Sequence, residues 1–342
     1  MKILIHSPAF LPQLGGLEIT TASLARGLVE SGDEVVVVTQ TPNDGDEDEP
    51  YRVFRNPSPL SLLRSVRWSD IVLHQNLSLR GFWPLLAVRR PLVISHHSWY
   101  RRVTGERGLR DRLKRAVVRH AAGSIAVSAA IAADLDSPAV VVENGYRDEL
   151  FHLDVATIRD RELLFVGRLV SDKGVDLLLR ALGILSSQGN RPRLVLVGEG
   201  PEREPLERLS LELGISRQVE FLGALRDEAL AAVYRRHLVL VVPSRYEEPF
   251  GVVALEGIAS GCVVVGSRGG GLPQAIGQCG LTFPNGDVES LATAIQSLLG
   301  NSEERTRRLA GAPEHLAKHG RGAMVEGYRA VLSAAVGRGG ST

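Results

Sequence analysis

The sequence predicts an α/β protein built from two doubly wound parallel sheets, and three observations carry this prediction. The chain has 342 residues, more than a single hydrophobic core usually serves, so two domains are expected. Short apolar runs alternate with amphipathic stretches, which is the order of βαβ units. Most of these runs have four or five apolar residues in a row, as strands buried on both faces do.

The first half of the chain opens with a strand and an amphipathic helix. Residues 2–6 (KILIH) are the predicted strand, and 18–32 carry Leu24, Ala25 and Leu28 at helical spacing. Further predicted strands follow at 33–40, 70–75, 91–97, 123–128 and 139–145. We expect an N-terminal domain over residues 1–155.

The second half repeats the pattern after a polar segment, 146–162, where we place the linker. Its predicted strands are 163–169, 193–200, 219–225, 238–244 and 262–267. Residues 288–335 are predicted to be helical, and the second domain is expected over 160–322. A last helix, at about 323–342, could pack back on the first domain. Ligands of such sheets bind beyond the carboxyl ends of the strands, so the default site is a cleft between two facing domains.

Composition excludes several classes of protein. The net charge of +1 provides no general attraction to nucleic acid or membranes. No apolar run reaches the roughly 18 to 20 residues that span a bilayer. The opening MKILIHSPAFLP does not resemble a signal peptide, and the two cysteines, Cys262 and Cys279, lack disulfide or metal spacing. We therefore expect a cytoplasmic, reducing location.

The segment FVGRLVSDKG places two cations beside a strand end. Arg168 and Lys173 flank a loop, and a helix is predicted to begin near Gly174. Backbone N–H groups at a helix N-terminus bind anions, and an arginine fork with a lysine suits a diphosphate. The alternative is two solvated loop cations.

Two glutamates eight residues apart, Glu248 and Glu256, lie in SRYEEPFGVVALEGIASG. The residues before Gly251 are predicted to turn into a helix, and Gly251 would let backbone approach a ligand. Eight helical residues would rise about 12 Å, comparable with a folded nucleotide-sugar. Glu248 could accept hydrogen bonds from a sugar and Glu256 from the two ribose hydroxyls. Taken alone, such a pair is more often a surface feature.

At these motifs the sequence resembles the retaining family 4 glycosyltransferases of GT-B fold, over nearly the whole chain. The resemblance runs in order through GGLE, VVVENG, FVGRLVSDKG, VLVGEGPE, VEFLGAL, PSRYEEPFGVVALEGIASG and SRGGGLPQAI. It implies two Rossmann-like domains facing a central cleft, an N-terminal acceptor-side domain and a C-terminal donor domain. The length and motifs also resemble family members of orthosomycin (avilamycin) antibiotic assembly.

The resemblance implies a nucleoside-diphosphate sugar donor, an acceptor hydroxyl and no metal or other cofactor. Arg168 and Lys173 would neutralise the diphosphate, Glu248 would hold the sugar and Glu256 the ribose. The other donor contacts that it implies are Gly15 and Gly16 at the distal phosphate, Phe250 and Gly251 through backbone, Leu222 at the base, Gly198 and Glu199 along the same wall, and Gly270 near the phosphates. The chain departs from many members at Gln274, where they have Glu.

His96 and His97 are the last two residues of the predicted strand 91–97. The resemblance implies that one histidine here touches the sugar or the acceptor, and histidine suits proton handling near neutral pH. Adjacent strand residues point to opposite sides, and we favour His97 for the cleft. The alternative for at least one of them is a purely structural histidine.

Two further segments are interpreted as solvated surface. The acidic run 44–49 contains D-x-D patterns but lies in a polar loop. The basic stretch 101–120 could meet an anionic membrane or an acidic acceptor, although a solvated helix is favoured.

The function predicted is sugar transfer with retention, in the assembly of a natural-product (antibiotic) oligosaccharide. The alternatives are a nucleotide-sugar 2-epimerase, a lipid- or polysaccharide-directed glycosyltransferase and a non-catalytic nucleotide-sugar binding module. A nicotinamide dehydrogenase is poorly supported, because GEG at 198–200 lacks the third glycine.

Overall fold

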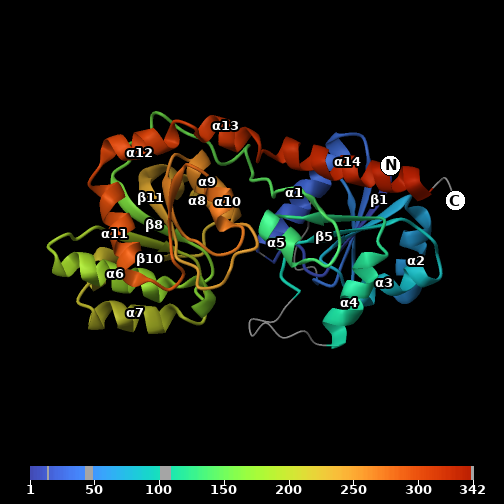
Figure 1. The fold of residues 1–342 in the computed structure, drawn as a ribbon, viewed down its shortest axis with the longest axis horizontal. Helices are drawn as coiled ribbons and strands as arrows, with labels where there is room; N and C mark the ends of the chain where they lie inside the picture. Colours follow the sequence, from blue (N-terminus) through green and yellow to red (C-terminus); the bar gives the residue numbers. More distant parts are fainter. Residues whose placement is uncertain (14, 43–48, 101–108, 340–342) are drawn as a thin grey trace. The chain divides into compact units, whose positions relative to one another are not determined.

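The structure is a computed structural model that describes residues 1–13, 15–42, 49–100 and 109–339. The chain forms two compact units (Figure 1). Unit 1 consists of Met1–Gly145 and Gly320–Thr342, and unit 2 is Tyr146–His319. The chain therefore leaves unit 1, completes unit 2, and returns to unit 1 for its last helix.

Unit 1 contains a seven-stranded parallel sheet in the order β3-β2-β1-β4-β5-β6-β7. Its strands are β1 (Lys2–Ser7), β2 (Glu34–Thr39), β3 (Arg52–Arg55), β4 (Ile71–Gln75), β5 (Leu92–His96), β6 (Gly123–Ala126) and β7 (Val140–Val141). The order reverses between β1 and β4, which makes the edge beyond these two strands the switch point at which such sheets bind ligands.

Helices cover both faces of this sheet. They are α1 (Gly16–Glu30), α2 (Pro59–Trp68), α3 (Leu79–Phe82), the 3-10 helix η1 (Trp83–Leu86), α4 (Leu109–Arg119), α5 (Ala129–Asp134) and α14 (Arg321–Gly339). Along β1, Ile3 and Ile5 join the core beneath α1 and α14, whereas Leu4 joins the core beneath α2. Because strand side chains alternate between faces, an unbroken apolar run feeds two cores at once.

Unit 2 contains a six-stranded parallel sheet in the order β10-β9-β8-β11-β12-β13. Its strands are β8 (Arg161–Val166), β9 (Leu194–Val197), β10 (Val219–Gly223), β11 (His237–Val242), β12 (Val263–Ser267) and β13 (Gly280–Phe283). The order reverses between β8 and β11. The loops that follow these two strands carry Arg168, Lys173 and Glu248.

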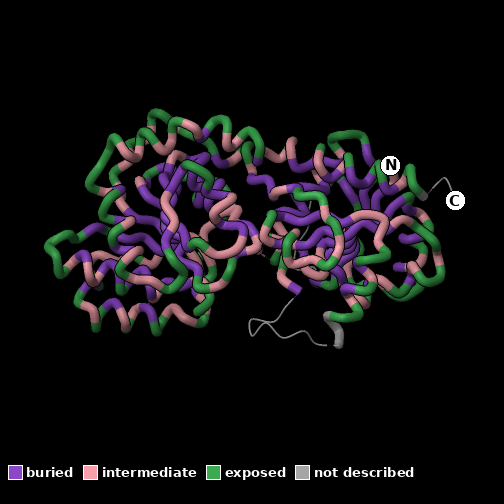
Figure 2. Tube along the Cα trace, in the orientation of Figure 1, coloured by how far each residue is buried: buried purple, intermediate pink, exposed green. Residues whose placement is uncertain are grey.

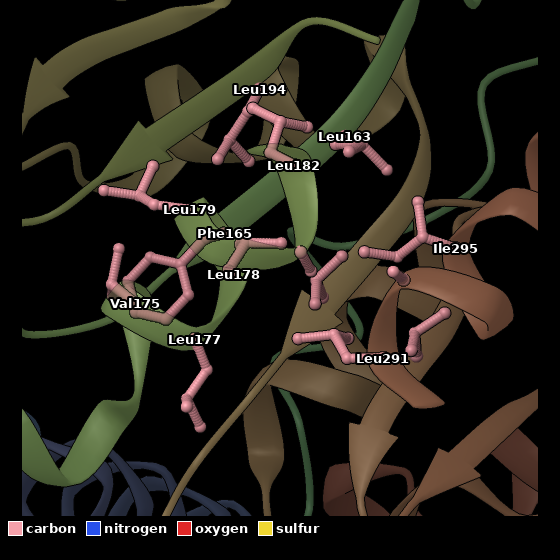
Figure 3. Close-up of a cluster of buried hydrophobic side chains, with 14 of the residues drawn as sticks. Leu163, Phe165, Val175, Leu177, Leu178, Leu179, Leu182, Leu194, Leu291 and Ile295 are labelled. Carbon is pink, nitrogen blue, oxygen red and sulfur yellow. The ribbon is translucent and has the colours of Figure 1, made fainter. Parts of the chain in front are cut away.

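The helices of unit 2 also lie on both faces. They are η2 (Ser171–Lys173), α6 (Val175–Ser187), α7 (Arg203–Glu212), η3 (Ser216–Gln218), α8 (Asp227–Arg236), α9 (Val252–Ala259), α10 (Leu272–Ile276), α11 (Val288–Leu299), α12 (Ser302–Leu309) and α13 (Ala312–Ala317). Figure 3 shows the core on one face, where Leu178 and Leu182 of α6 and Leu291 and Ile295 of α11 meet Leu163 of β8. In Figure 2 the strands of each unit are mostly buried, and the outer sides of its helices are mostly exposed.

The predicted α/β class with two parallel sheets is confirmed, and so are most of the predicted strands. Two strands were missed: β3 and β13, four residues each at sheet edges. Residues of β3 are exposed or half-buried, so its sequence RVFR lacks the apolar run of a central strand. The strand predicted at 139–145 shrinks to two exposed residues, Val140 and Val141.

The polar segment 146–162 lies within unit 2. Phe151 is buried and meets the ring of Tyr234 edge-on, with 5.5 Å between centroids. Arg147 Nη1 donates to Asp227 Oδ1 at 2.7 Å. These contacts anchor the start of the second unit to its own helix α8.

Candidate functional site

The loop after β8 is held against the loop after β11. Gly174 ends η2 and begins α6, as predicted, with φ +65°. A Cβ at Gly174 would lie 2.1 Å from the carbonyl oxygen of Pro243, so only glycine permits this approach. The backbone N–H of Arg245 also donates to the carbonyl of Asp172 at 2.9 Å.

This approach brings together Lys173 and Glu248. Lys173 Nζ donates to Glu248 Oε1 at 2.6 Å, and Ser244 Oγ donates to the same oxygen at 2.6 Å. The carboxylate of Glu248 is nearly buried, and half-buried Lys173 retains access to solvent. Arg168 lies exposed in the same loop as Lys173. The two predicted phosphate-binding cations and the predicted sugar-binding carboxylate therefore lie at one edge of one sheet.

Backbone also fixes Glu248. Its carbonyl accepts a hydrogen bond from the N–H of Gly271 at 2.7 Å, and Glu248 pairs with Gly270 as an isolated parallel bridge. Gly270 has φ +68°, and a Cβ there would lie 2.1 Å from the Glu248 carbonyl. Gly270 is thus required for the shape of the Glu248 loop.

The turn predicted before α9 is present. Gly251 has φ +120° and begins α9, and any other residue would be strained in this backbone conformation. Phe250 is buried and packs against His319, so it can offer a ligand only its backbone. The first turn of α9 contains no acidic side chain, which leaves its N–H groups and dipole suited to an anion.

Glu256 lies within α9 and is buried. Tyr234 donates its hydroxyl to Glu256 Oε2 at 3.1 Å. Burial raises the pKa of Glu256 to about 7, and the charge of Arg147 and the Tyr234 hydrogen bond oppose this rise. Only the ionised carboxylate accepts hydrogen bonds at both of its oxygens. A ligand that donates to both oxygens therefore requires Glu256 to be ionised.

The helix does not span the interval between the two glutamates. It starts at Val252, and Glu248 belongs to the preceding loop. The prediction that eight residues of helix set the separation of the glutamates is therefore wrong.

A second group of predicted residues lies at the ends of β8, β9 and β10. The N–H of Gly198 donates to the Gly223 carbonyl at 2.8 Å, and a Cβ on Gly198 would lie 1.8 Å from the Gly167 carbonyl. Glu199 forms an ion pair with Arg203 at 2.6 Å. Leu222 is 39% exposed beside a register shift in β10, which leaves its edge accessible.

In unit 1, Gly15 and Gly16 form the start of α1 beyond the end of β1. The N-cap Gly15 is extended, and a Cβ there would lie 2.4 Å from Glu18 Oε2. Gly16 is exposed with open space around its Cβ position. This helix start therefore presents backbone to solvent.

The two histidines bind different partners. His96 is fully buried, and its Nδ1 lies 2.7 Å from the Tyr100 hydroxyl. Half-buried His97 places Nε2 2.5 Å from Gln75 Oε1 and 2.9 Å from Ser95 Oγ. Ser95 Oγ lies 2.6 Å from the hydroxyl of Tyr328, which α14 supplies.

Burial lowers the pKa of both His96 and His97 to about 3. Both rings are therefore neutral near pH 7, which favours hydrogen bonding over proton transfer. A neutral imidazole has one donor and one acceptor nitrogen. The partners of His97 Nε2 therefore determine whether Nδ1 donates or accepts a hydrogen bond.

Sequence reasoning missed Ser244, Tyr234, Arg147, Gln75 and Tyr328. Ser244 is the first residue of SRYEEPFGVVALEGIASG, but nothing in the sequence marks its bond to Glu248. The others meet their partners only through sheet pairing and helix packing between distant segments. Gln274 lies in α10 and has a partner within the structure.

Residues 43–48 and 101–108 of the acidic and basic segments lie outside the described residues. Glu49, at the end of the acidic run, forms an ion pair with Arg26 at 2.6 Å. Within the part of the chain that the structure describes, no three His, Cys, Asp or Glu side chains group as metal ligands would. None of the helices in the described ranges is both long and apolar enough to cross a membrane.

Two family models match the chain in succession. Residues 14–150 match the model described as Glycosyltransferase Family 4, and residues 155–315 match Glycosyl transferases group 1.

Two curated relatives illustrate the range of similarity. D-inositol 3-phosphate glycosyltransferase of Corynebacterium jeikeium is 40% identical over 169 residues, 47% of this chain and 40% of that protein. The chain thus matches less than half the length of this relative. Uncharacterized glycosyltransferase MJ1607 of Methanocaldococcus jannaschii is 29% identical over 328 residues, 81% of this chain and 83% of that protein.

Solved structures are similar over the whole chain. Sucrose-phosphate synthase from Thermosynechococcus elongatus has a TM-score of 0.80 at 25% identity and covers 97% of this chain and 99% of its own. Anabaena HepE in complex with UDP has a TM-score of 0.83 at 19% identity, covering 98% and 100%. AviGT4, involved in avilamycin A biosynthesis, has a TM-score of 0.70 at 20% identity, covering 98% of each chain.

Proposed function

Because the chain belongs to the group 1, family 4-like glycosyltransferases of GT-B fold, we propose that it transfers a sugar from a nucleoside-diphosphate donor to an acceptor hydroxyl. The observation that carries the proposal is the Lys173–Glu248 pair at the switch point of unit 2, with Arg168 in the same loop. A cation pair beside a buried carboxylate provides for both a diphosphate and a sugar.

Arg168, Lys173 and the N–H groups at the start of α9 would stabilise the diphosphate as it leaves. Glu248 would accept hydrogen bonds from the sugar, and Glu256 from the ribose. Leu222, Gly198 and Glu199 would border the base, and Gly270 would shape the loop beside the phosphates. Gly15 and Gly16 of unit 1 would offer N–H groups to the distal phosphate, and His97 would bind the sugar or acceptor as a neutral group.

Retention at the anomeric carbon is part of the proposal. The bond from the anomeric carbon to the diphosphate oxygen breaks as the acceptor oxygen bonds to that carbon, on the same face. The acceptor proton passes to the departing diphosphate. No metal enters this scheme, and no carboxylate is assigned as a covalent nucleophile.

UDP is the first donor nucleotide to test, because HepE, a similar fold, binds it. We infer no particular sugar or acceptor. A role in antibiotic assembly rests on a 20% identity to AviGT4, which is evidence for the fold alone, and transfer to a lipid or polysaccharide is an equal proposal.

Calorimetric titration of UDP, GDP, ADP and dTDP tests the site. We expect micromolar binding of one nucleotide, weakened about 10- to 100-fold by Lys173→Ala, the loss of one charge-assisted phosphate contact. Lys318→Ala is the matched control, since Lys318 forms an exposed ion pair with Glu314 in α13 of unit 2. If the control weakens binding equally, or no nucleotide binds, the assignment of the diphosphate site is wrong.

Glu248→Gln separates the two ends of the donor. The variant removes the charge that pairs with Lys173, so we expect UDP affinity to hold or rise while sugar transfer falls.

Incubating the protein with sugar derivatives of the bound nucleotide, without acceptor, distinguishes a 2-epimerase, which would release an epimer. A non-catalytic module would bind the donor and release no nucleotide with any acceptor.

A further inference from the structure

Unit 1 exposes two large apolar side chains on η1. Trp83 is 38% and Leu86 78% exposed. A 3-10 helix has three residues per turn, so these two residues lie on the same side of η1. Phe82 and Leu85, by contrast, are half-buried and pack on the core beneath α2. The exposed pair is therefore not needed to complete that core.

Arginines surround this apolar pair. Arg80 precedes it, Arg89 and Arg90 follow it, and all three are exposed. The sequence has no Asp or Glu between Asp70 and Glu106. The positive charge of this segment is consequently not balanced by acidic residues within the segment itself.

Helix α4 presents a second stripe of the same kind. Arg112, Leu113, Ala116 and Arg119 are exposed at helical spacing, and Leu113 is 53% exposed. Asp134 and Asp136 offset part of the positive charge of α4. Arg115 is buried against both carboxylates, and Arg119 lies 3.7 Å from Asp136.

A groove lies between the two segments that carry these stripes. It has a volume of about 440 Å³ and lies between α3–η1 and α4, which are neighbours in Figure 1. Its walls are mostly apolar and come from both segments: Phe82, Leu85, Ala116 and Val117, with Arg90 and His120 at polar positions.

We propose that α3, η1 and the described part of α4 form a docking surface for an anionic lipid bilayer. Tryptophan and leucine between arginines suit the boundary of headgroups and acyl chains, where the apolar side chains insert and the guanidinium groups meet lipid phosphates. A soluble polyanion would use the arginines but has no use for Trp83 and Leu86 in solvent. The proposal is independent of the donor site in unit 2.

Sedimentation of the full chain with vesicles tests this surface. We expect binding to vesicles of phosphatidylcholine with about 30% phosphatidylglycerol, and little to phosphatidylcholine alone, because each arginine contributes about fivefold in affinity at an anionic surface. The double variant Arg80→Gln/Arg89→Gln should then bind about 25-fold more weakly. Trp83→Ser/Leu86→Ser should also weaken binding, whereas Leu211→Ser, an exposed leucine on α7 of unit 2, should not.

Tryptophan fluorescence locates the contact. Among Trp68, Trp83 and Trp99, only Trp83 lies on this surface, so a blue shift on adding anionic vesicles should vanish in Trp83→Phe while sedimentation persists. Circular dichroism melting would verify that each variant is folded.

Three results would overturn the proposal. One is the absence of sedimentation with anionic vesicles. Another is equal sedimentation of the Trp83→Ser/Leu86→Ser variant and the parent chain. The last is binding to heparin that competes fully with vesicles and requires only the arginines, which would assign the surface to soluble polyanions.

Discussion

Glu256 shows how burial shapes one side chain. Its carboxyl contacts the Tyr234 hydroxyl in a helix otherwise packed on the core, and its pKa rises to about 7 from an ordinary 4.5. Between these pH values the folded chain holds a proton that the unfolded chain has released. Stability must therefore fall as pH rises through this window, since the unfolded state binds fewer protons.

The variant Glu256→Gln keeps the acceptor for Tyr234 and removes the titration. We expect its unfolding free energy, measured relative to wild type in urea, to improve by up to about 3 kcal/mol between pH 4.5 and pH 7.5. Glu212→Gln, an exposed glutamate at the end of α7, should show no such trend. A flat difference for Glu256→Gln would mean that Glu256 is ionised throughout the folded state.

A second residue-scale prediction concerns two buried tyrosines, Tyr328 and Tyr100. Tyr328 contacts Ser95 and His97, whereas Tyr100 contacts His96. Tyr328→Phe removes the hydroxyl beside Ser95 and loosens the partners of His97, whereas Tyr100→Phe loosens only His96. Each should cost about 1 kcal/mol of stability. Only Tyr328→Phe should lower kcat, by about tenfold, with UDP affinity unchanged. Equal loss of kcat in both variants would reduce the effect to general destabilisation.

At the scale of elements, the loops after β8 and β11 depend on glycine. Gly174→Ala places a side chain on a left-handed backbone and also puts its Cβ 2.1 Å from the Pro243 carbonyl oxygen. Gly189→Ala, at φ +88° with open space around its Cβ, has only the first of these two costs. We expect about 1 to 2 kcal/mol of destabilisation for Gly189→Ala and at least about 2 kcal/mol more for Gly174→Ala. Calorimetry should show a loss of UDP affinity only for Gly174→Ala, and equal costs would refute the close approach.

The helices and strands could be predicted where the sequence of the segment itself carries the signal. An apolar run such as the one in β1 indicates a strand, because both faces of such a strand are buried. The edge strands β3 and β13 lack that signal. Gly174, Gly251 and Lys173 could be singled out because loops and helix starts have local chemistry. The partners Tyr234 and Tyr328 could not, since their hydroxyls bond segments that only the tertiary fold brings together. Ser244 could not either, because its bond to Glu248, four residues further on, depends on how the loop after β11 turns.

At the scale of the molecule, each unit has its own core, so the two should melt as separate transitions. Leu332→Ala opens a cavity beneath α14 in unit 1, and Leu182→Ala opens one beneath α6 in unit 2. Each should cost about 2 to 5 kcal/mol in its own transition. In calorimetric scans UDP should raise only the transition that Leu182→Ala lowers, because we place the nucleotide in unit 2. One shared transition that both variants shift alike would show that the cores unfold together.

The return of the chain to unit 1 at Gly320 has a consequence for biosynthesis. As the polypeptide leaves the ribosome, unit 2 is complete while unit 1 still lacks Met324, Tyr328 and Leu332, which close its core. The first unit to be translated is thus the last to be completed. One apolar face of its sheet lacks the covering helix α14 while about 175 residues are translated. A stop codon at Gly320, after the last residue of unit 2, would leave unit 2 intact and deprive unit 1 of the helix that closes its core.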